Sequence, residues 1–360
     1  MVTGTNGKGS VASTLSAIAT AAGLKVGLFT SPHLAWPTER YRVNDTDISW
    51  DQFERMGCRV LDAVAKSGME VSHFEALTAL GLCWFAENEV DLQILEVGLG
   101  AKRDATRAAQ PTHVIVTGVA MDHAELIGPT LVDIANEKLA VCEPGVSSVV
   151  SLPASLRHMA PSCSLMGRDF RYRRTAEKLY VWSDGHRLEL PKPTLFGPHQ
   201  GKNTALASVM ALKLGVNEEA IARGIQRVRW PARMEKISDT PPTWLDSAHN
   251  PQAVGMLLKT LDELNIQDGF SLVYGSHPKK DTAQIIRRLA ARAGDVWCTT
   301  APLLKPENDV YELLKGRPRV HVNANPLECL KAAQKLGRTV LVTGSIYLVG
   351  ELMRQMEADA

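Results

Sequence analysis

The chain has 360 residues, of which 45% are hydrophobic and 22% charged, and its formal net charge is +1. This length predicts two domains, each large enough to bury its own core. A charge so close to neutral argues against nucleic acid or a membrane surface as the main partner. The six cysteines form no C-x-x-C pair, which indicates reduced thiols and no zinc site. The sequence contains neither an apolar run of membrane-spanning length nor a signal peptide, so we expect a cytoplasmic protein.

A glycine-rich stretch, GTNGKGS at residues 4–10, stands almost at the start of the chain. Its glycines allow successive backbone amides to turn toward an anion, and Lys8 can reach outer phosphates. The stretch from Ser10 to Ala22 then predicts a helix behind the loop. In the common P-loop a Ser or Thr follows the lysine and binds magnesium, but here that residue is Gly9. The sequence therefore predicts a phosphate site whose metal is held mainly by residues elsewhere.

Apolar runs and helical patterns alternate through the first two thirds of the chain. A short strand at 25–30 and a polar loop come first. Further predicted strands occupy 92–100, 113–123 and 147–153, and they alternate with predicted helices at 74–87 and 131–141. This alternation predicts a parallel sheet with helices on both faces.

A second series of the same kind begins near Thr243. Its predicted helices cover 251–264, 282–293, 308–315 and 326–336. We therefore predict an α/β protein in which a P-loop-type, doubly wound parallel sheet domain (1–236) precedes a smaller Rossmann-like α/β domain (243–360). The proline-containing segment 237–243 is expected to be the linker.

Three predicted strand ends of the first domain carry possible magnesium ligands. They are Ser31, Glu96 and the Asp122-His123 pair. Magnesium prefers hard oxygen donors, and ligands gather at the carboxyl ends of parallel strands. A carboxylate within so apolar a strand needs a partner, and a cation is the simplest one. The alternative for Glu96 is a carboxylate that pairs with a helix, and the alternative for His123 is a surface histidine.

Ten ordered motifs resemble the folylpolyglutamate synthase/dihydrofolate synthase family. They are GTNGKGS (4–10), TSPHL (30–34) with ER (39–40), FEALTAL (74–80), LEVGLGAKRDAT (95–106), MDH (121–123), NEK (136–138), HQGKN (199–203), WPARME (230–235), LDSAHNP (245–251) and TGSIYLVGE (343–351). The resemblance runs from the first residues to about Glu351, and ten motifs in order are far more specific than one glycine-rich loop.

The resemblance implies an ATP-dependent acid–amino-acid ligase related to the muramyl ligases. ATP would phosphorylate an acceptor carboxylate, and the amine of L-glutamate would attack the acyl phosphate. With dihydropteroate as acceptor the product is dihydrofolate, and with a reduced folate it is a longer glutamate tail. The implied partners are these small molecules, and the implied oligomeric state is a monomer.

The same resemblance implies the cation ligands and a modified lysine. By position, Ser31, Glu96 and His123 match the magnesium ligands of the family, for one or two ions. Lys138 matches a lysine that is carbamylated in this group, which would turn an ammonium into a pair of ligating oxygens. The alternative for Lys138 is a solvated side chain paired with Glu137.

The nucleotide would be held by residues of both domains, with the active site between them. The implied contacts are Gly4, Thr5, Asn6, Gly7, Lys8, Gly9, Ser10, Gln200, Asn203, Arg233, Asp246 and His249. The implied catalytic residues are Lys8, His123, Lys138, Arg233 and His249. A helix cap is the alternative for Gln200 and Asn203, and a capped turn is the alternative for Asp246 and His249.

The acceptor would lie against the loops that carry Pro32, His33, Phe74, Glu75 and Asp104. Core packing is the alternative for Phe74, and a helix cap is the alternative for Asp104.

Some positions depart from the family pattern and leave the acceptor open. The loop 100–107 reads GAKRDATR, Ser247 replaces a glycine, and the second domain has Lys279-Lys280-Asp281. Only Met1 to Thr3 precede the glycine-rich loop, so we expect the first helix and the first central strand to be lacking, with their neighbours left unpaired. The rival functions are a non-catalytic nucleotide- or folate-binding remnant, a muramyl-type amino-acid ligase and a kinase.

Overall fold

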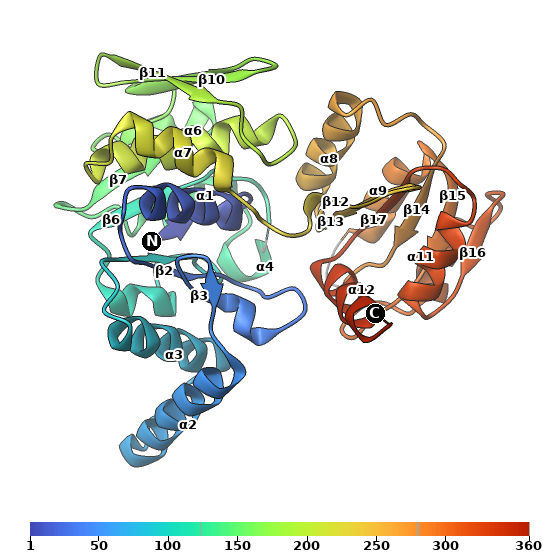
Figure 1. The fold of residues 1–360 in the computed structure, drawn as a ribbon, viewed down its shortest axis with the longest axis horizontal. Helices are drawn as coiled ribbons and strands as arrows, with labels where there is room; N and C mark the ends of the chain where they lie inside the picture. Colours follow the sequence, from blue (N-terminus) through green and yellow to red (C-terminus); the bar gives the residue numbers. More distant parts are fainter. Residues whose placement is uncertain (123, 279–280, 360) are drawn as a thin grey trace. The chain divides into compact units, whose positions relative to one another are not determined.

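The computed structural model describes residues 1–122, 124–278 and 281–359. They form two compact units, each with its own sheet and cores (Figure 1). The first unit contains Met1–His33, Thr38–Thr194 and Gln200–Arg229. The second unit contains Leu34–Pro37, Leu195–His199 and Trp230–Ala360.

The first unit is built on a mainly parallel sheet, as predicted. Its strands are β1 (Val2–Thr3), β2 (Val26–Phe29), β3 (Tyr41–Val43), β4 (Thr46–Asp47), β5 (Leu92–Leu95), β6 (His113–Val116), β7 (Ser147–Val150) and β8 (Ser164–Leu165). They pair in the orders β4-β3-β2-β5 and β1-β6-β7-β8. A parallel bridge between Val2 and Glu96 connects the two sets. Only β3 and β4 pair in antiparallel fashion within this sheet.

The expected loss of the first central strand is wrong. Residues Val2 and Thr3 form β1, which pairs in parallel with Ile115 and Val116 of β6. On its other edge Val2 accepts a hydrogen bond from the amide of Val97 (3.0 Å). A strand of two residues therefore occupies the central position and gives the backbone of both neighbours a partner.

Helices cover both faces of this sheet (Figure 1). They are α1 (Lys8–Ala21), α2 (Trp50–Ser67), α3 (His73–Glu87), α4 (Ala124–Ile127), α5 (Leu131–Leu139), α6 (His199–Lys213) and α7 (Glu218–Arg227). Capping boxes at Ser49 and Ser72 define the starts of α2 and α3. A separate antiparallel sheet, β11-β10-β9, packs on α6 and α7; its strands are β9 (Phe170–Arg174), β10 (Lys178–Ser183) and β11 (His186–Pro191).

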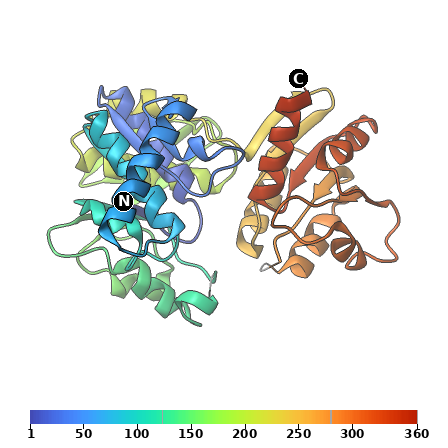
Figure 2. The ribbon, with the colours of Figure 1, turned by 90° about the horizontal axis from the view of Figure 1, so that it is seen from below.

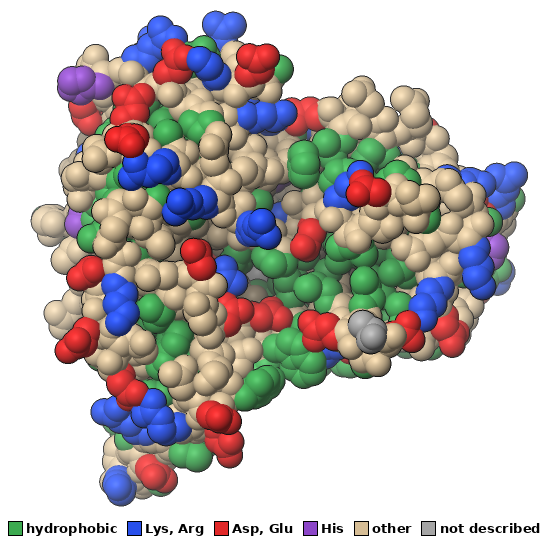
Figure 3. Space-filling view, in the orientation of Figure 1, with side chains coloured by type: hydrophobic (Ala, Val, Ile, Leu, Met, Phe, Trp, Pro, Cys, Tyr) green, Lys and Arg blue, Asp and Glu red, His purple; other side chains and the backbone are tan. Residues whose placement is uncertain are grey.

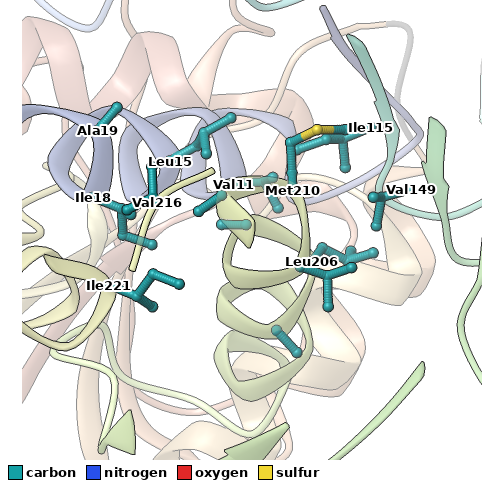
Figure 4. Close-up of a cluster of buried hydrophobic side chains, with 14 of the residues drawn as sticks. Val11, Leu15, Ile18, Ala19, Ile115, Val149, Leu206, Met210, Val216 and Ile221 are labelled. Carbon is teal, nitrogen blue, oxygen red and sulfur yellow. The ribbon is translucent and has the colours of Figure 1, made fainter. Parts of the chain in front are cut away.

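The helix behind the glycine-rich loop is held in the largest core of this unit (Figure 4). Val11, Leu15 and Ile18 of α1 are buried together with Leu206 and Met210 of α6. Full burial of each such side chain stabilises the fold by about 1.5–3 kcal/mol. This packing fixes α1, and with it the loop at its amino end.

The second unit contains a six-stranded sheet in the order β12-β13-β17-β14-β15-β16. Its strands are β12 (Arg233–Asp239), β13 (Pro242–Asp246), β14 (Phe270–Tyr274), β15 (Ala293–Cys298), β16 (Val320–Val322) and β17 (Val340–Thr343). Its helices are α8 (Pro251–Glu263), α9 (Thr282–Ala290), α10 (Glu307–Glu312), α11 (Pro326–Gln334) and α12 (Ile346–Asp359), and α12 runs beside β13 (Figure 2). All pairs are parallel except β12 with β13.

The segment 237–243 is not the predicted linker. It contains the end of β12, the turn and the start of β13, inside the second unit. The prolines and polar residues that suggested a linker are equally typical of a tight turn.

Charges of both signs are interspersed on the face of the first unit that Figure 3 shows. This distribution agrees with the formal net charge of +1. Within the described ranges, none of the helices combines the length and the apolar character that a membrane span requires.

Candidate active site

Two glycines give the loop between β1 and α1 its shape. Gly4 has φ +140°, and a Cβ atom there would lie 2.0 Å from Oγ1 of Thr117. Gly7 has φ +89° and caps α1, and a Cβ atom there would lie 2.8 Å from Oδ1 of Asn203. Only glycine fits both positions, because a side chain would meet these neighbours and strain the backbone.

The loop is tied to the segment that follows β6. The amide of Thr5 donates to the carbonyl of Gly118 (2.9 Å), and the hydroxyl of Thr117 donates to the carbonyl of Asn6 (2.7 Å). Lys8 Nζ donates to the carbonyl of Gly4 (3.2 Å), so its ammonium lies across the loop. Gly7 offers no side chain to cap α1, which leaves the positive end of the helix open to an anion. This cradle fits the phosphates of a nucleotide.

Ser31 and Glu96 lie together, as the positions of the strand ends predicted. Ser31 stands two residues after β2 and Glu96 directly after β5. The amide of Ser31 donates to Oε2 of Glu96 at 3.2 Å, and Glu96 is only 5% exposed. A buried carboxylate beside a serine suits a hard divalent cation. His123, the third predicted ligand, lies outside the described residues.

Lys138 is buried near the end of α5, so the alternative of a solvated lysine does not hold. It is 4% exposed, and burial lowers its pKa from 10.5 to about 8. The positive charge of Lys8 contributes to this lowering, while Asp122 and Glu137 act in the opposite direction. The carboxylate of Glu137 accepts hydrogen bonds from the amides of Ala101 (3.2 Å) and Lys102 (2.9 Å), and so also holds the loop after β5.

Gln200 and Asn203 project from the first turns of α6 and are 1% and 2% exposed. Nδ2 of Asn203 donates to Oε1 of Gln200 at 2.9 Å. The Nε2 atom of Gln200 is buried and has no hydrogen-bond partner among the described residues. A buried amide without a partner beside the phosphate loop is what a residue that binds a polar ligand would show. A helix cap would not leave this donor unpaired.

Three of the predicted acceptor residues have clear structural contacts. The ring of Phe74 packs against Phe29, with ring centroids 5.9 Å apart. Glu75 is exposed and completes the capping box with Ser72, whose hydrogen bonds lower the pKa of the Glu75 carboxyl. Asp104 accepts hydrogen bonds from three backbone amides and from the hydroxyl of Thr106. These contacts support the core and cap alternatives for Phe74 and Asp104.

The other two predicted acceptor residues lie after β2. Pro32 is exposed, and His33 accepts a hydrogen bond at Nδ1 from Nε of the buried Arg40 (2.9 Å). This bond orients the imidazole ring of His33.

In the second unit, Arg233 and Asp246 are opposite each other in the β12–β13 hairpin. The Asp246 carboxylate accepts from the amides of Met234 (3.1 Å) and Ala248 (2.9 Å), and burial raises its pKa despite the opposing effect of Arg233. Nδ1 of His249 lies 2.8 Å from the carbonyl of Ser247. A guanidinium, a buried carboxylate and an imidazole therefore come from one end of the hairpin, where β12 begins and β13 ends. The bonds within residues 246–249 also agree with the alternative of a capped turn.

Two residues that support the loop, one directly and one through the other, were not predicted from the sequence. Thr117 follows β6 and holds Asn6, and Lys202 donates from Nζ to the carbonyl of Thr117 (2.9 Å). The rule that selected Glu96, a polar residue at a strand end, would also have found Thr117. Lys202 stands within the HQGKN motif, but its side-chain contact depends on the fold.

The comparisons with known proteins agree with this fold. Residues 232–346 match the family described as Mur ligase, glutamate ligase domain. A dihydrofolate synthase/folylpolyglutamate synthase of Escherichia coli K12 is 32% identical over 99% of this chain and 86% of its own length. The solved structure "E.coli FolC in complex with DHPP and ADP" has a TM-score of 0.89 and 29% identity, over 99% of this chain and 88% of that chain.

A longer relative gives the same result over slightly less than half of its length. A probable bifunctional folylpolyglutamate synthase/dihydropteroate synthase of Haloferax volcanii is 32% identical over 97% of this chain, which spans 45% of that protein. The fold and the matched glutamate ligase domain thus define a protein with the Mur ligase fold. More particularly, the chain belongs to the dihydrofolate synthase/folylpolyglutamate synthase family.

Proposed function

We propose that this chain is an ATP-dependent ligase that joins L-glutamate to dihydropteroate, to a reduced folate, or to both. The observation that carries the proposal is the phosphate cradle of Gly4 and Gly7, with Lys8 across it and the Ser31–Glu96 pair at neighbouring strand ends. Family membership makes glutamate ligation the reaction that this cradle serves best.

The chemistry requires activation of a carboxylate, because a carboxylate is a poor electrophile until one oxygen becomes a leaving group. In the proposed reaction an acyl phosphate forms on the acceptor, and the amine of glutamate displaces the phosphate. The backbone amides of the loop and the Lys8 ammonium would stabilise the transferred phosphoryl group. Ser31, Glu96 and His123 would hold magnesium, which supplies further charge neutralisation when it is bound.

We propose that Lys138 carries a carbamate. Its buried side chain and a pKa of about 8 leave a small fraction of neutral amine near neutral pH, far more than at the usual value of 10.5, and that form reacts with carbon dioxide. The test is a ¹³C NMR spectrum of the protein in ¹³C-bicarbonate, in which a carbamate signal should vanish in Lys138→Met and persist in Lys66→Met, an exposed-lysine control. A signal that is the same in both variants, or absent from the wild type, would reject the carbamate.

The second unit would contribute to the same reaction. Arg233 suits bidentate contact with a phosphate, and Asp246 would accept from the ribose of the nucleotide. We assign His249 to the phosphates. The role of Arg233 predicts that Arg233→Ala raises the KM for ATP. The variant should also have a lower melting temperature, because the buried Asp246 carboxylate loses a neighbouring positive charge.

We further propose that the chain works as a monomer in the cytoplasm on small-molecule substrates alone. Light scattering coupled to gel filtration measures the mass in solution directly, and a dimer at assay concentrations would refute the monomer.

The decisive assay is glutamate-dependent release of ADP, measured separately with dihydropteroate and with tetrahydrofolate. We expect turnover with at least one acceptor and its loss in Lys8→Ala and Glu96→Gln. The matched control is Lys66→Ala, which removes an exposed lysine of α2. A folded chain that binds ADP but turns over neither acceptor would refute the ligase and favour the non-catalytic alternative.

A further inference from the structure

Lys202 is a half-buried cation in the first turns of α6. A lysine there is disfavoured twice, because burial removes water from the ammonium and because the amino end of a helix is itself positive. Burial indeed lowers the pKa of Lys202. An exposed residue could avoid both costs, so this side chain requires a specific compensation where it lies.

Part of the cost of placing the Lys202 ammonium there is offset by the segment that follows β6. Nζ of Lys202 donates to the carbonyl of Thr117 at 2.9 Å. A Cβ atom on Gly118 would lie 3.3 Å from the same nitrogen, so the segment passes close to the ammonium. Within the described residues this is the one hydrogen bond of the Lys202 ammonium, which has three N–H donors, so two donors are left for a ligand.

The same segment holds the phosphate loop at two points. The hydroxyl of Thr117 donates to the carbonyl of Asn6 at 2.7 Å, and the carbonyl of Gly118 accepts from the amide of Thr5 at 2.9 Å. Lys202 is therefore connected to the phosphate loop through one intervening residue. The connection lies entirely within the first unit.

We propose that Lys202 is a positioning residue of the nucleotide site, which fixes the phosphate loop through Thr117 and places a second positive charge, besides Lys8, beside it. The inference rests on the proposed nucleotide site. A bound phosphate would offset the cost of burying the ammonium, so the lysine and the nucleotide stabilise each other.

The test is a double-mutant cycle on ADP binding, measured by calorimetry without acceptor or glutamate. Lys202→Met should weaken ADP binding by roughly tenfold, the effect of losing a hydrogen bond that involves a charged group. Thr117→Val removes the hydroxyl and keeps the shape of the side chain, and should weaken ADP binding severalfold. Because both changes break one connection, the double variant should be little weaker than Lys202→Met.

Three further variants separate positioning from general destabilisation. Lys202→Arg keeps the charge and should recover part of the affinity, and Thr117→Ser keeps the hydroxyl and should bind like the wild type. Lys213→Met removes an exposed lysine from the same helix and should change nothing. If Lys202→Met fails to fold, the contrast between Thr117→Val and Thr117→Ser still tests the connection, and equal affinities would overturn it.

The outcomes distinguish this proposal from the ligase. If the wild type binds ADP while Lys202→Met binds equally well, or if the two losses multiply in the double variant, the positioning role is wrong and the ligase is untouched. If the cycle shows coupling but neither acceptor is turned over, the ligase is wrong and the positioning role stands. If the wild type does not bind ADP at all, both the positioning role of Lys202 and the proposed ligase are wrong.

Discussion

Replacing Lys138 by methionine should change how the stability of the chain depends on pH. The side chain is buried near the end of α5, and its pKa in the folded chain is about 8 instead of 10.5. Methionine has a similar length and no charge. We expect Lys138→Met to be more stable than the wild type near pH 7, and the difference to shrink as the pH rises.

The direction follows from which state holds the proton. Below about pH 8 both the folded and the unfolded chain carry a protonated Lys138, and the folded chain bears the full cost of the buried charge. Between about 8 and 10.5 the unfolded chain keeps the proton and the folded chain loses it, so a rise in pH favours folding. At about 1.4 kcal/mol for each pH unit, the wild type should gain about 3 kcal/mol relative to Lys138→Met across this window.

The assay is urea denaturation of both proteins at four pH values from 7 to 10, in buffers free of carbon dioxide so that no carbamate forms. Taking the difference between the two proteins removes the contribution of other titrating groups. The exposed-lysine variant Lys66→Met should parallel the wild type. Curves of wild type and Lys138→Met that stay parallel across the window would refute the inference that Lys138 is buried as a costly charge.

Three further substitutions test the geometry of the first unit and of the segment that follows β13. Gly4→Ala should abolish ADP binding and destabilise the chain by about 2–4 kcal/mol, since its Cβ would lie 2.0 Å from Thr117 Oγ1. Gly23 also has a positive φ, but an added Cβ atom there would have no neighbour within 4 Å. Gly23→Ala should therefore show only the smaller cost of backbone strain when the unfolding of both variants is measured by scanning calorimetry. Asp104→Asn should lower stability by about 1–3 kcal/mol in urea denaturation, because one amide oxygen cannot replace two carboxylate oxygens that accept four hydrogen bonds. Ser247→Ala loses a buried hydroxyl bond of 3.1 Å and should cost about 1 kcal/mol, and an unchanged urea midpoint would contradict that role.

The sequence predicted the parts of the site that follow from local rules. Glycines at positions 4 and 7 indicate a backbone that other residues cannot adopt, and the structure gives both a positive φ. The proximity of Ser31 and Glu96 follows from the rule that parallel strands end at one edge of a sheet. Both inferences need only the order of the elements.

The parts that the sequence did not predict depend on contacts between distant segments. The sheet β9–β11 alternates buried residues with charged ones, and its place on α6 and α7 is set by packing rather than by any local signal. The segment 237–243, which includes the hairpin turn, has the composition of a linker, and only its pairing distinguishes the two. The burial of Lys138 and the bond of Lys202 to Thr117 likewise depend on the fold, because the sequence around them is typical of exposed helix surface.

The shortness of β1 is compensated by how the loop is held. A strand of two residues supplies little pairing of its own, but the loop after it is bonded to the segment that follows β6 through Thr5 and Asn6. At the other end Gly7 is fixed by the buried core beneath α1. The position of the phosphate loop thus depends on side-chain and backbone bonds to neighbouring segments more than on the strand before it. Loss of the Thr117 hydroxyl should accordingly weaken nucleotide binding while β1 stays paired.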